Sequence, residues 1–331
     1  TIDAMAPSIG EVLESTSLEA EQTSPGERTR LAEALEYILS DGKAGKDPLD
    51  GPPLSPESMD PVLAKRVNKA ISSMDQFAES FERFKVFNDP NASLKKISDA
   101  VTGDLVFSSK VLKVANSPYF GLKGRVASVH HAVTILGMDS MKTLYFKEYF
   151  KMLGGGGARQ AQLRHQVWAH SMAAAIIASN LASCAKGVRR EVAFTLGLLH
   201  DVGKFVIQGL LANGDEGTAS EIHSNDDIRQ ELKQLGIHHA LTGRMAAESW
   251  NLPPVISRAI GLHHSMSLIK SETMEKKQVF MAHLAILFLA DQLAKLLSPD
   301  PKAPAEPHPL PPKWRSFLDL DRVRTQILGG G

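Results

Sequence analysis

The chain contains a single cysteine, Cys184, among its 331 residues. One thiol cannot form a disulfide within the chain, so a small secreted fold held together by disulfides is excluded, and a reducing cytoplasm suits the composition. Net charge is also lacking, because 37 basic side chains balance 37 acidic ones. This balance excludes a global field that would draw the protein to nucleic acid or to an anionic membrane surface.

Long uninterrupted apolar runs are missing as well. The most apolar segment, FMAHLAILFLADQLAKLL at residues 280–297, is interrupted by His283 and Asp291, whereas a membrane-spanning helix needs about 20 mainly apolar residues. No basic and apolar signal segment is visible at the start of the sequence. We therefore expect a cytoplasmic protein with no membrane and no nucleic-acid partner.

The first 60 residues form an acidic extension, with thirteen acidic and four basic side chains. The segment SPGERTRLAEALEYILS at 24–40 predicts one helix, with Ser24 as cap and Pro25 in the first turn. Its apolar residues share one face, which must dock on some other surface. Two interpretations of the extension stay open: it lies over a basic surface of the main body, or it is a solvated tail.

The rest of the chain reads as helical throughout. Residues 61–157 repeat apolar side chains at intervals of three and four and contain no convincing pair of strands. Four glycines at 154–157 indicate a flexible joint before a second helical block at 158–297, which holds nine of the twelve histidines. Seven prolines within residues 299–312 end that block, and residues 298–331 form a proline-rich linker with a short final helix. The sequence predicts an all-α fold.

A histidine and an aspartate, His200 and Asp201, stand side by side in FTLGLLHDVGKFVI, an apolar run that we expect to be helical. Burying both is costly unless they are paired, hydrogen-bonded or bound to metal, and Lys204 one turn later offers the simplest pairing. The same block contains further candidates within VWAHSMA, GIHHALTG, GLHHSM and FLADQLA. Packed helices can point such side chains into one cavity, and imidazole with carboxylate suits iron, manganese, zinc or nickel better than calcium.

These motifs resemble those of the HD superfamily of metal-dependent phosphohydrolases. The signature of that superfamily is a histidine, a later His-Asp doublet and a final aspartate, which His170, His200, Asp201 and Asp291 match in order. More specifically, residues 76–295 resemble the HDOD family, the HD-related output domains of bacterial signalling proteins. The motifs that carry this resemblance are VLKVANSPYFGL, SVHHAVTILGMDSMKTL, VWAHS, LLHDVGK, HHALTGRMAAESWNLP and AIGLHH.

The resemblance implies a two-lobed, HD-like helical body that serves as a signalling or regulatory module. Three more histidines match additional ligand positions of the related HD-GYP cyclic-di-GMP phosphodiesterases. The resemblance therefore implies a site for one or two divalent transition-metal ions with seven candidate ligands, which are His170, His200, Asp201, His239, His263, His264 and Asp291.

The chain departs from the HD-GYP pattern in two places. No Gly-Tyr-Pro sequence follows His264, which argues against cyclic-di-GMP hydrolysis. Gln166 stands where some HD-GYP members carry a glutamate that helps hold a third metal, so two ions are the most we expect. In an active site of this kind Asp201 would bridge two cations and Lys204 would balance phosphate charge, while Gly203 would allow a close approach between helices.

Two functional hypotheses follow. The first and favoured one is a regulatory protein that acts through contacts with a signalling partner, with a metal or a nucleotide as the sensed ligand. The second is a metal-dependent phosphohydrolase acting on a nucleotide or cyclic dinucleotide, in which Asp201 and Lys204 are catalytic. A salt bridge between Lys204 and Asp201 is an equally weighted structural role for the lysine.

Overall fold

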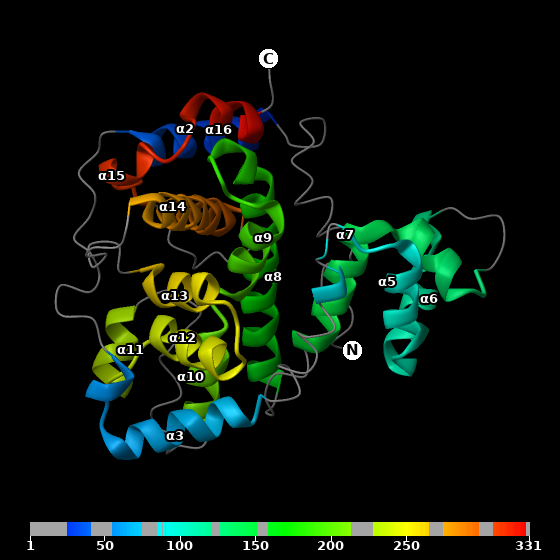
Figure 1. Cartoon of the computed structure of the whole chain (residues 1–331), viewed down its shortest axis with the longest axis horizontal. Coiled ribbons are helices and arrows are strands. Elements are labelled where there is room, and N and C mark those ends of the chain that lie inside the picture. The colour runs from blue at the N-terminus through cyan, green and yellow to red at the C-terminus, as the bar shows by residue number, and fades with distance from the viewer. Residues whose placement is uncertain are drawn as a thin grey trace. The chain divides into compact units, whose positions relative to one another are not determined.

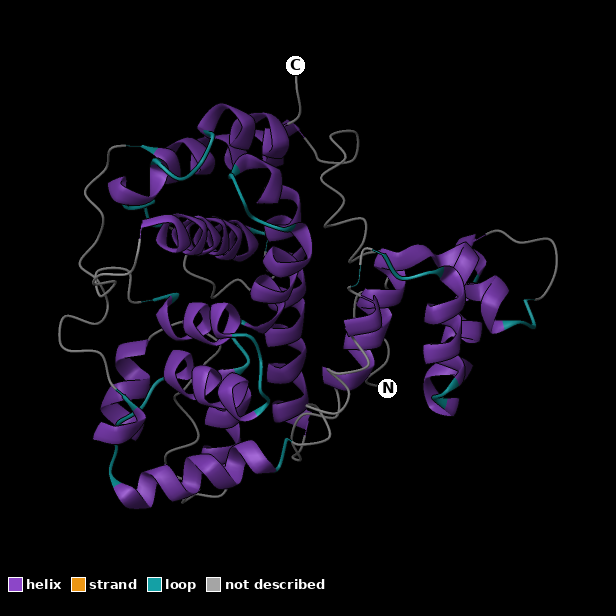
Figure 2. Cartoon of the chain, in the orientation of Figure 1, coloured by secondary structure: helices purple, strands orange, loops and turns teal. Residues whose placement is uncertain are grey.

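All regular elements in the described part of the chain are helices, which confirms the predicted all-α fold (Figures 1 and 2). A computed structural model describes residues 25–40, 55–74, 85–87, 89, 91–120, 126–150, 158–212, 228–264, 274–297 and 307–328. The predicted glycine joint, most of the acidic extension and the first part of the proline-rich linker lie outside these residues. The chain divides into two compact units, one of residues 1–14 and 73–155 and the other of residues 15–72 and 156–331.

The first unit packs three helices, α5 (Leu94–Thr102), α6 (Leu105–Ala115) and α7 (Val129–Phe150). Its core contains an aromatic cluster in which the ring of Tyr145 lies 4.8 Å from that of Phe87 and 4.9 Å from that of Phe107. Ring pairs at this spacing bury a large apolar area and add a geometric preference of their own.

The core of the second unit is formed by α8 (Ala158–Leu181), α9 (Arg190–Leu199) and α14 (Met274–Leu296), with α8 packed against both of the others. The segments Gln162–Cys184 and Gln278–Leu296 are long and apolar enough to cross a membrane by length and composition alone. However, 67% and 78% of their apolar windows are buried inside the protein. Burial of this extent is what core helices of a globular protein show.

Five further helices belong to the body of the second unit. The helices α10 (Gly203–Ala212) and α12 (His239–Ser249) pack against each other, and α13 (Pro254–Leu262) packs on α12. The helix α3 (Pro61–Ser72) lies across α10 and α12, at the bottom of Figure 1. One more short helix, α11 (Ile228–Leu235), precedes α12.

The two ends of the described chain meet in a structure that we call the terminal clasp, which consists of α2 (Pro25–Leu39) and residues 307–328. The latter contain α15 (Pro312–Arg315) and α16 (Leu320–Leu328), and α2 lies beside α16 and packs on α14 (Figure 1). The helix predicted over 24–40 is therefore present, and it packs against α14 and α16.

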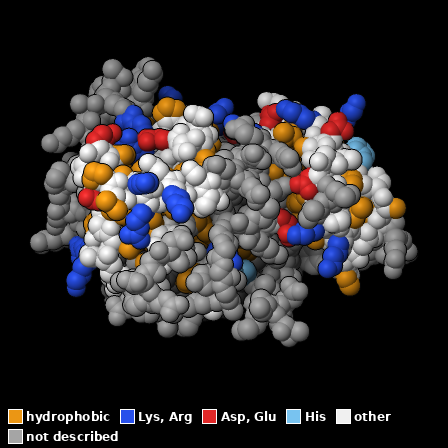
Figure 3. Space-filling view, turned by 90° about the horizontal axis from the view of Figure 1, so that it is seen from below, with side chains coloured by type: hydrophobic (Ala, Val, Ile, Leu, Met, Phe, Trp, Pro, Cys, Tyr) orange, Lys and Arg blue, Asp and Glu red, His pale blue; other side chains and the backbone are white. Residues whose placement is uncertain are grey.

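The face of the molecule drawn in Figure 3 carries both basic and acidic side chains among hydrophobic and neutral ones. This mixed surface agrees with the balanced composition of the whole chain.

Candidate metal centre

The His200–Asp201 doublet lies at a turn between two helices, where the sequence suggested the middle of an apolar helical run. The helix α9 ends at Leu199, and the chain turns before α10 begins at Gly203. Both side chains are buried, each with 1% of its surface exposed. The turn directs them into the interior, where other helices bring the remaining candidates.

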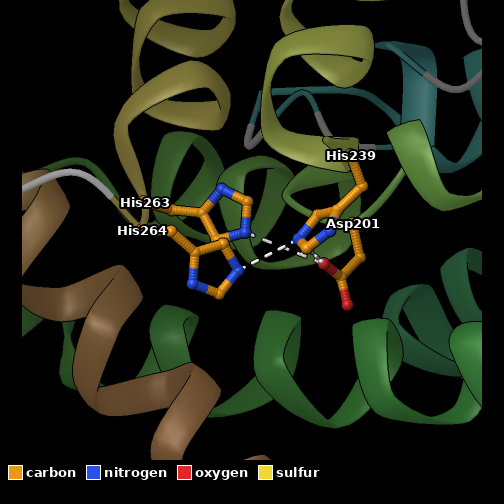
Figure 4. A group of neighbouring side chains, drawn as sticks. All are labelled: Asp201, His239, His263 and His264. Atoms are coloured by element: carbon orange, nitrogen blue, oxygen red, sulfur yellow. Dashed lines mark hydrogen bonds and ion pairs between the residues drawn. The ribbon is translucent and has the colours of Figure 1, made fainter. Parts of the chain in front are cut away.

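One group of candidate ligands consists of Asp201, His239, His263 and His264, whose ligand atoms lie within 4.8 Å of one another. Figure 4 shows the three imidazole rings and the carboxylate pointing toward a common centre. The Oδ1 atom of Asp201 lies 3.4 Å from Nε2 of His239 and 3.7 Å from Nε2 of His263. The Nε2 atoms of His239 and His264 are 3.0 Å apart.

A second group consists of His170, His200 and Asp291, which come from α8, the end of α9 and α14. The Nε2 atoms of the two histidines are 3.2 Å apart. The Oδ1 atom of Asp291 lies 3.0 Å from Nε2 of His170 and 3.5 Å from Nε2 of His200.

Asp201 connects the two groups. Its Oδ2 atom lies 3.4 Å from Nε2 of His200 and 3.6 Å from Nε2 of His170, while its Oδ1 atom faces the first group. The structure thus brings all seven predicted ligand residues together around one carboxylate. A carboxylate with one oxygen toward each of two ligand groups is suited to bridging two cations.

Hydrogen bonds at the outer ring nitrogens orient the histidines. Nδ1 of His200 lies 2.7 Å from the carbonyl oxygen of Gly197, and Nδ1 of His263 lies 2.6 Å from that of Ile260. A carbonyl oxygen only accepts, so each Nδ1 carries a hydrogen, and a ring that is not protonated at Nε2 presents the lone pair of that atom to the centre. The Nε2 atom of His263 is buried without a hydrogen-bond partner. Such convergent lone pairs fit a bound transition-metal ion.

Glu231 on α11 is a functional candidate that the sequence did not reveal. Its Oε2 atom lies 2.8 Å from Nδ1 of His239 and accepts a hydrogen bond of 2.7 Å from the backbone N–H of the same residue. Burial by itself would raise the pKa of Glu231, but the attraction and hydrogen bonds of His239 outweigh it and hold that pKa below its ordinary value. Glu231 therefore stays ionised and orients His239.

Replacing Glu231 by Gln is expected to weaken metal binding by the group around His239 roughly 10- to 100-fold, because partners that orient a ligand histidine contribute on this scale. Competition with a chromogenic chelator measures this affinity. The matched control is Glu248→Gln on α12, where the carboxylate is exposed and pairs with Arg244. Equal affinities in the two variants would show that Glu231 does not act on the centre.

Two lysines balance the charge of the aspartates. Nζ of Lys204 lies 2.6 Å from Oδ2 of Asp201, and Nζ of Lys295 lies 2.7 Å from Oδ2 of Asp291. Although burial opposes ionisation, Lys295 and the histidines lower the pKa of Asp291 well below its ordinary value. Burial likewise disfavours a charged His200, yet the two aspartates raise its pKa. The centre therefore favours an added positive charge, whether a proton or a metal ion.

His238 lies next to a candidate ligand but has a structural role. Its Nδ1 atom accepts a hydrogen bond of 3.3 Å from the backbone N–H of Leu241, so the ring caps the first turn of α12. Burial, with a smaller contribution from His239, lowers the pKa of His238 to about 4. The ring is therefore neutral near pH 7, as a cap that accepts a hydrogen bond requires.

Fold and centre together define an all-helical protein of the HD type, in which histidines and aspartates from several helices meet at one point. The model of the HDOD domain family matches residues 76–266, and the chain belongs to this family. The terminal clasp and the whole of α14 lie beyond the matched residues.

The chain is also similar to individual proteins. An uncharacterized protein of Treponema pallidum is 25% identical over 274 residues, which make up 80% of this chain and 49% of that protein, so the chain spans about half of its length. A solved HDOD domain protein of unknown function from Geobacter sulfurreducens is 24% identical, with 80% of this chain and 90% of that one covered and a TM-score of 0.49.

A solved structure from Marinobacter aquaeolei VT8, whose name proposes a role in signal transduction, is 21% identical with a TM-score of 0.50. The similarity covers 95% of this chain and 66% of that one. At this level of identity the likeness concerns the fold.

Proposed function

We propose that this chain is a regulatory signalling protein whose centre binds one or two divalent transition-metal ions and which acts through contacts with a signalling protein partner. The observation that carries this proposal is the burial of the centre. The His170 side chain is 13% exposed and that of Asp291 is 8% exposed, while those of His200 and Asp201 are 1% exposed. Turnover requires an open coordination position that a substrate can reach, whereas a sensed or structural ion does not.

The residues present fit metal ions. His170, His200 and Asp291 with one oxygen of Asp201 would hold one ion, and the group around His239 with the other oxygen would hold a second. Nitrogen and oxygen ligands of this kind suit iron, manganese, zinc or nickel. The family supports the signalling role, as does the name of the Marinobacter protein. A nucleotide is a further candidate for the sensed ligand.

One observation favours a second candidate function, a metal-dependent phosphohydrolase acting on a nucleotide or cyclic dinucleotide. Each oxygen of Asp201 faces a different ligand group, and Lys204 lies beside the same carboxylate. Bound metal ions in such a site supply Lewis-acid activation of water and of the phosphate oxygens. Asp201 would then hold the ions in place, and Lys204 would neutralise charge on a phosphate.

Metal analysis tests the premise that both functions share. Protein purified without chelators, then reconstituted with iron or manganese, is expected to contain about one or two metal ions per chain, and His200→Ala is expected to lose them. His131→Ala, which removes an exposed histidine of α7, is the matched control. A chain that takes up no transition metal under either condition would overturn both functions.

The reconstituted protein should then be tested for turnover and for a metal-dependent conformational response. A regulatory protein is expected not to hydrolyse bis(p-nitrophenyl) phosphate, nucleotides or cyclic dinucleotides, and its amide exchange outside the centre is expected to change when metal binds. Hydrolysis that requires metal and disappears in His200→Ala would establish the phosphohydrolase instead.

A further inference from the structure

The side chain of Gln292 connects the terminal clasp to the candidate metal centre. Gln292 follows Asp291 on α14 and is 5% exposed. Its Oε1 atom accepts a hydrogen bond of 2.8 Å from the backbone N–H of His308, and its Nε2 atom donates one of 3.3 Å to Oδ2 of Asp291. The buried side-chain amide of Gln292 thus makes two hydrogen bonds. Its oxygen accepts one from the clasp, and its nitrogen donates one to a candidate ligand.

On the clasp side, the segment around His308 is held by the opposite end of the chain. The backbone N–H of Leu310 donates a hydrogen bond of 2.7 Å to the carbonyl oxygen of Ile38 in α2. The guanidinium of Arg315 donates to the carbonyl oxygens of Leu310 and Ser40. The side chain of Leu310 is fully buried. The position of the His308 N–H therefore depends on the docking of α2 and residues 307–328 against each other.

On the side of the centre, Gln292 fixes the orientation of a carboxylate. Oδ2 of Asp291 accepts a hydrogen bond from Nε2 of Gln292 and lies 2.7 Å from Nζ of Lys295. Oδ1 of the same carboxylate lies 3.0 Å from Nε2 of His170. An ammonium on a flexible stem supplies charge, but it sets the plane of a carboxylate less strictly than a donor on a short, buried side chain. Gln292 therefore helps to keep Oδ1 directed at the histidines.

We propose that Gln292 is a positioning residue that couples docking of the terminal clasp to metal binding at the group of His170, His200 and Asp291. The inference rests on the proposed function, because it concerns the affinity for the bound ion. Coupling of this kind is reciprocal: a docked clasp strengthens metal binding, and bound metal strengthens clasp docking by the same factor. Since the whole of α14 and the whole clasp lie outside residues 76–266, this coupling is an addition to the matched HDOD region.

Two substitutions at one position test the connection in the full-length chain. His308→Pro removes the N–H that donates to Gln292, in a stretch that already reads Pro-His-Pro. His308→Ala keeps that N–H and removes only an exposed side chain. We expect His308→Pro to weaken binding of Co²⁺ roughly tenfold, as loss of an outer partner of a ligand does, and to alter the visible Co²⁺ spectrum. His308→Ala is expected to match the wild-type protein in both measurements.

Gln292→Met provides a second variant that leaves the other clasp contacts in place. It removes both hydrogen bonds of the amide at similar volume and is expected to weaken Co²⁺ binding roughly 10- to 100-fold. Gln278→Met on the exposed face of α14 is its control. Hydrogen exchange completes the test: metal should slow exchange in α2 and α16 of the wild-type chain, and this effect should be lost in Gln292→Met.

The outcomes distinguish the inference from the function on which it rests. A wild-type chain that binds no Co²⁺ or other transition metal contradicts the proposed function. If the wild-type chain binds metal, and both His308→Pro and Gln292→Met bind it as tightly with an unchanged spectrum, the coupling through Gln292 is wrong and the proposed function stands. If His308→Pro displaces the clasp altogether, the same loss of Co²⁺ affinity is expected, because the hydrogen bond from the clasp to Gln292 is lost in that case too.

Discussion

Replacing Asp201 by Asn is expected to abolish metal binding at both ligand groups at once. The carboxylate directs Oδ2 toward His170 and His200 and Oδ1 toward His239, so it is the one side chain that both groups share. An amide offers a single neutral acceptor in its place. Because partners outside the ligand set already contribute about 10- to 100-fold in affinity, loss of a bridging ligand should exceed about 100-fold. Elemental analysis after reconstitution measures the result.

A control must separate loss of the ligand from loss of the fold. Asp201→Asn leaves the ammonium of Lys204 without its carboxylate in a site where the lysine side chain is only 11% exposed. Removing the charge of one partner in a buried ion pair destabilises a protein by about 3–5 kcal/mol. Adding Lys204→Met removes the stranded charge and should recover much of this loss in urea unfolding, yet metal binding should stay absent. Asp321→Asn, which replaces an exposed aspartate of α16, is the surface control.

One outcome would contradict the bridging role of Asp201. If Asp201→Asn, alone or with Lys204→Met, still binds one ion per chain with wild-type affinity, one group is complete without the shared carboxylate. The two groups would then be independent sites.

The candidate ligands could be predicted from the sequence because each lies in a local motif. The His-Asp doublet, the paired histidines and the final aspartate can be recognised by their neighbours along the chain, and the structure brings them together. The all-α fold could be predicted for a similar reason, since helical periodicity is a local signal. Local motifs do not reveal which oxygen of Asp201 faces which histidines, because that depends on how four separate helices pack.

Two of the supporting residues could not be predicted from the sequence. Glu231 and Gln292 carry no signal of their own, because their contacts with His239 and with the backbone of His308 exist only once separate segments pack together. Lys295 differs, since it lies four residues after Asp291 on the same helix, a spacing at which side chains pair locally. The apolar run around the doublet predicts a continuous helix and does not reveal the turn at His200 and Asp201. Likewise, the apolar face of α2 predicts burial but does not name α14 and α16 as its partners, because amphipathicity carries no information about the opposite surface.

At Gly203 the fold and the centre depend on each other, and Gly203→Ala is expected to damage both. A Cβ atom at this position would lie 1.9 Å from the carbonyl oxygen of His239 and 2.5 Å from the backbone nitrogen of Gly243. These are backbone atoms of α12, so no side chain can rotate away. The helices α10 and α12 must separate, and overpacking of this kind costs about 1–3 kcal/mol or more in the free energy of unfolding.

Separation of these helices should act on the two ligand groups unequally. His239 is the first residue of α12, so its imidazole moves with the helix, whereas His170 and Asp291 lie on α8 and α14. We expect Gly203→Ala to lose the ion at the group of His239 and to keep more of the binding at the group of His170, and Co²⁺ titration followed by its visible spectrum resolves the two.

The matched control for Gly203→Ala is Gly209→Ala on the same helix. A Cβ at Gly209 would meet only the side chain of Ala70, at 3.6 Å, which is an ordinary contact. Because alanine is more favourable than glycine inside a helix by roughly 0.5–1 kcal/mol, this variant is expected to be as stable as the wild-type chain or slightly more stable, with unchanged metal binding. Equal unfolding free energies for the two variants would refute the close approach at Gly203, whereas destabilisation of Gly203→Ala alone would establish that the missing side chain lets α12 bring His239 to Asp201.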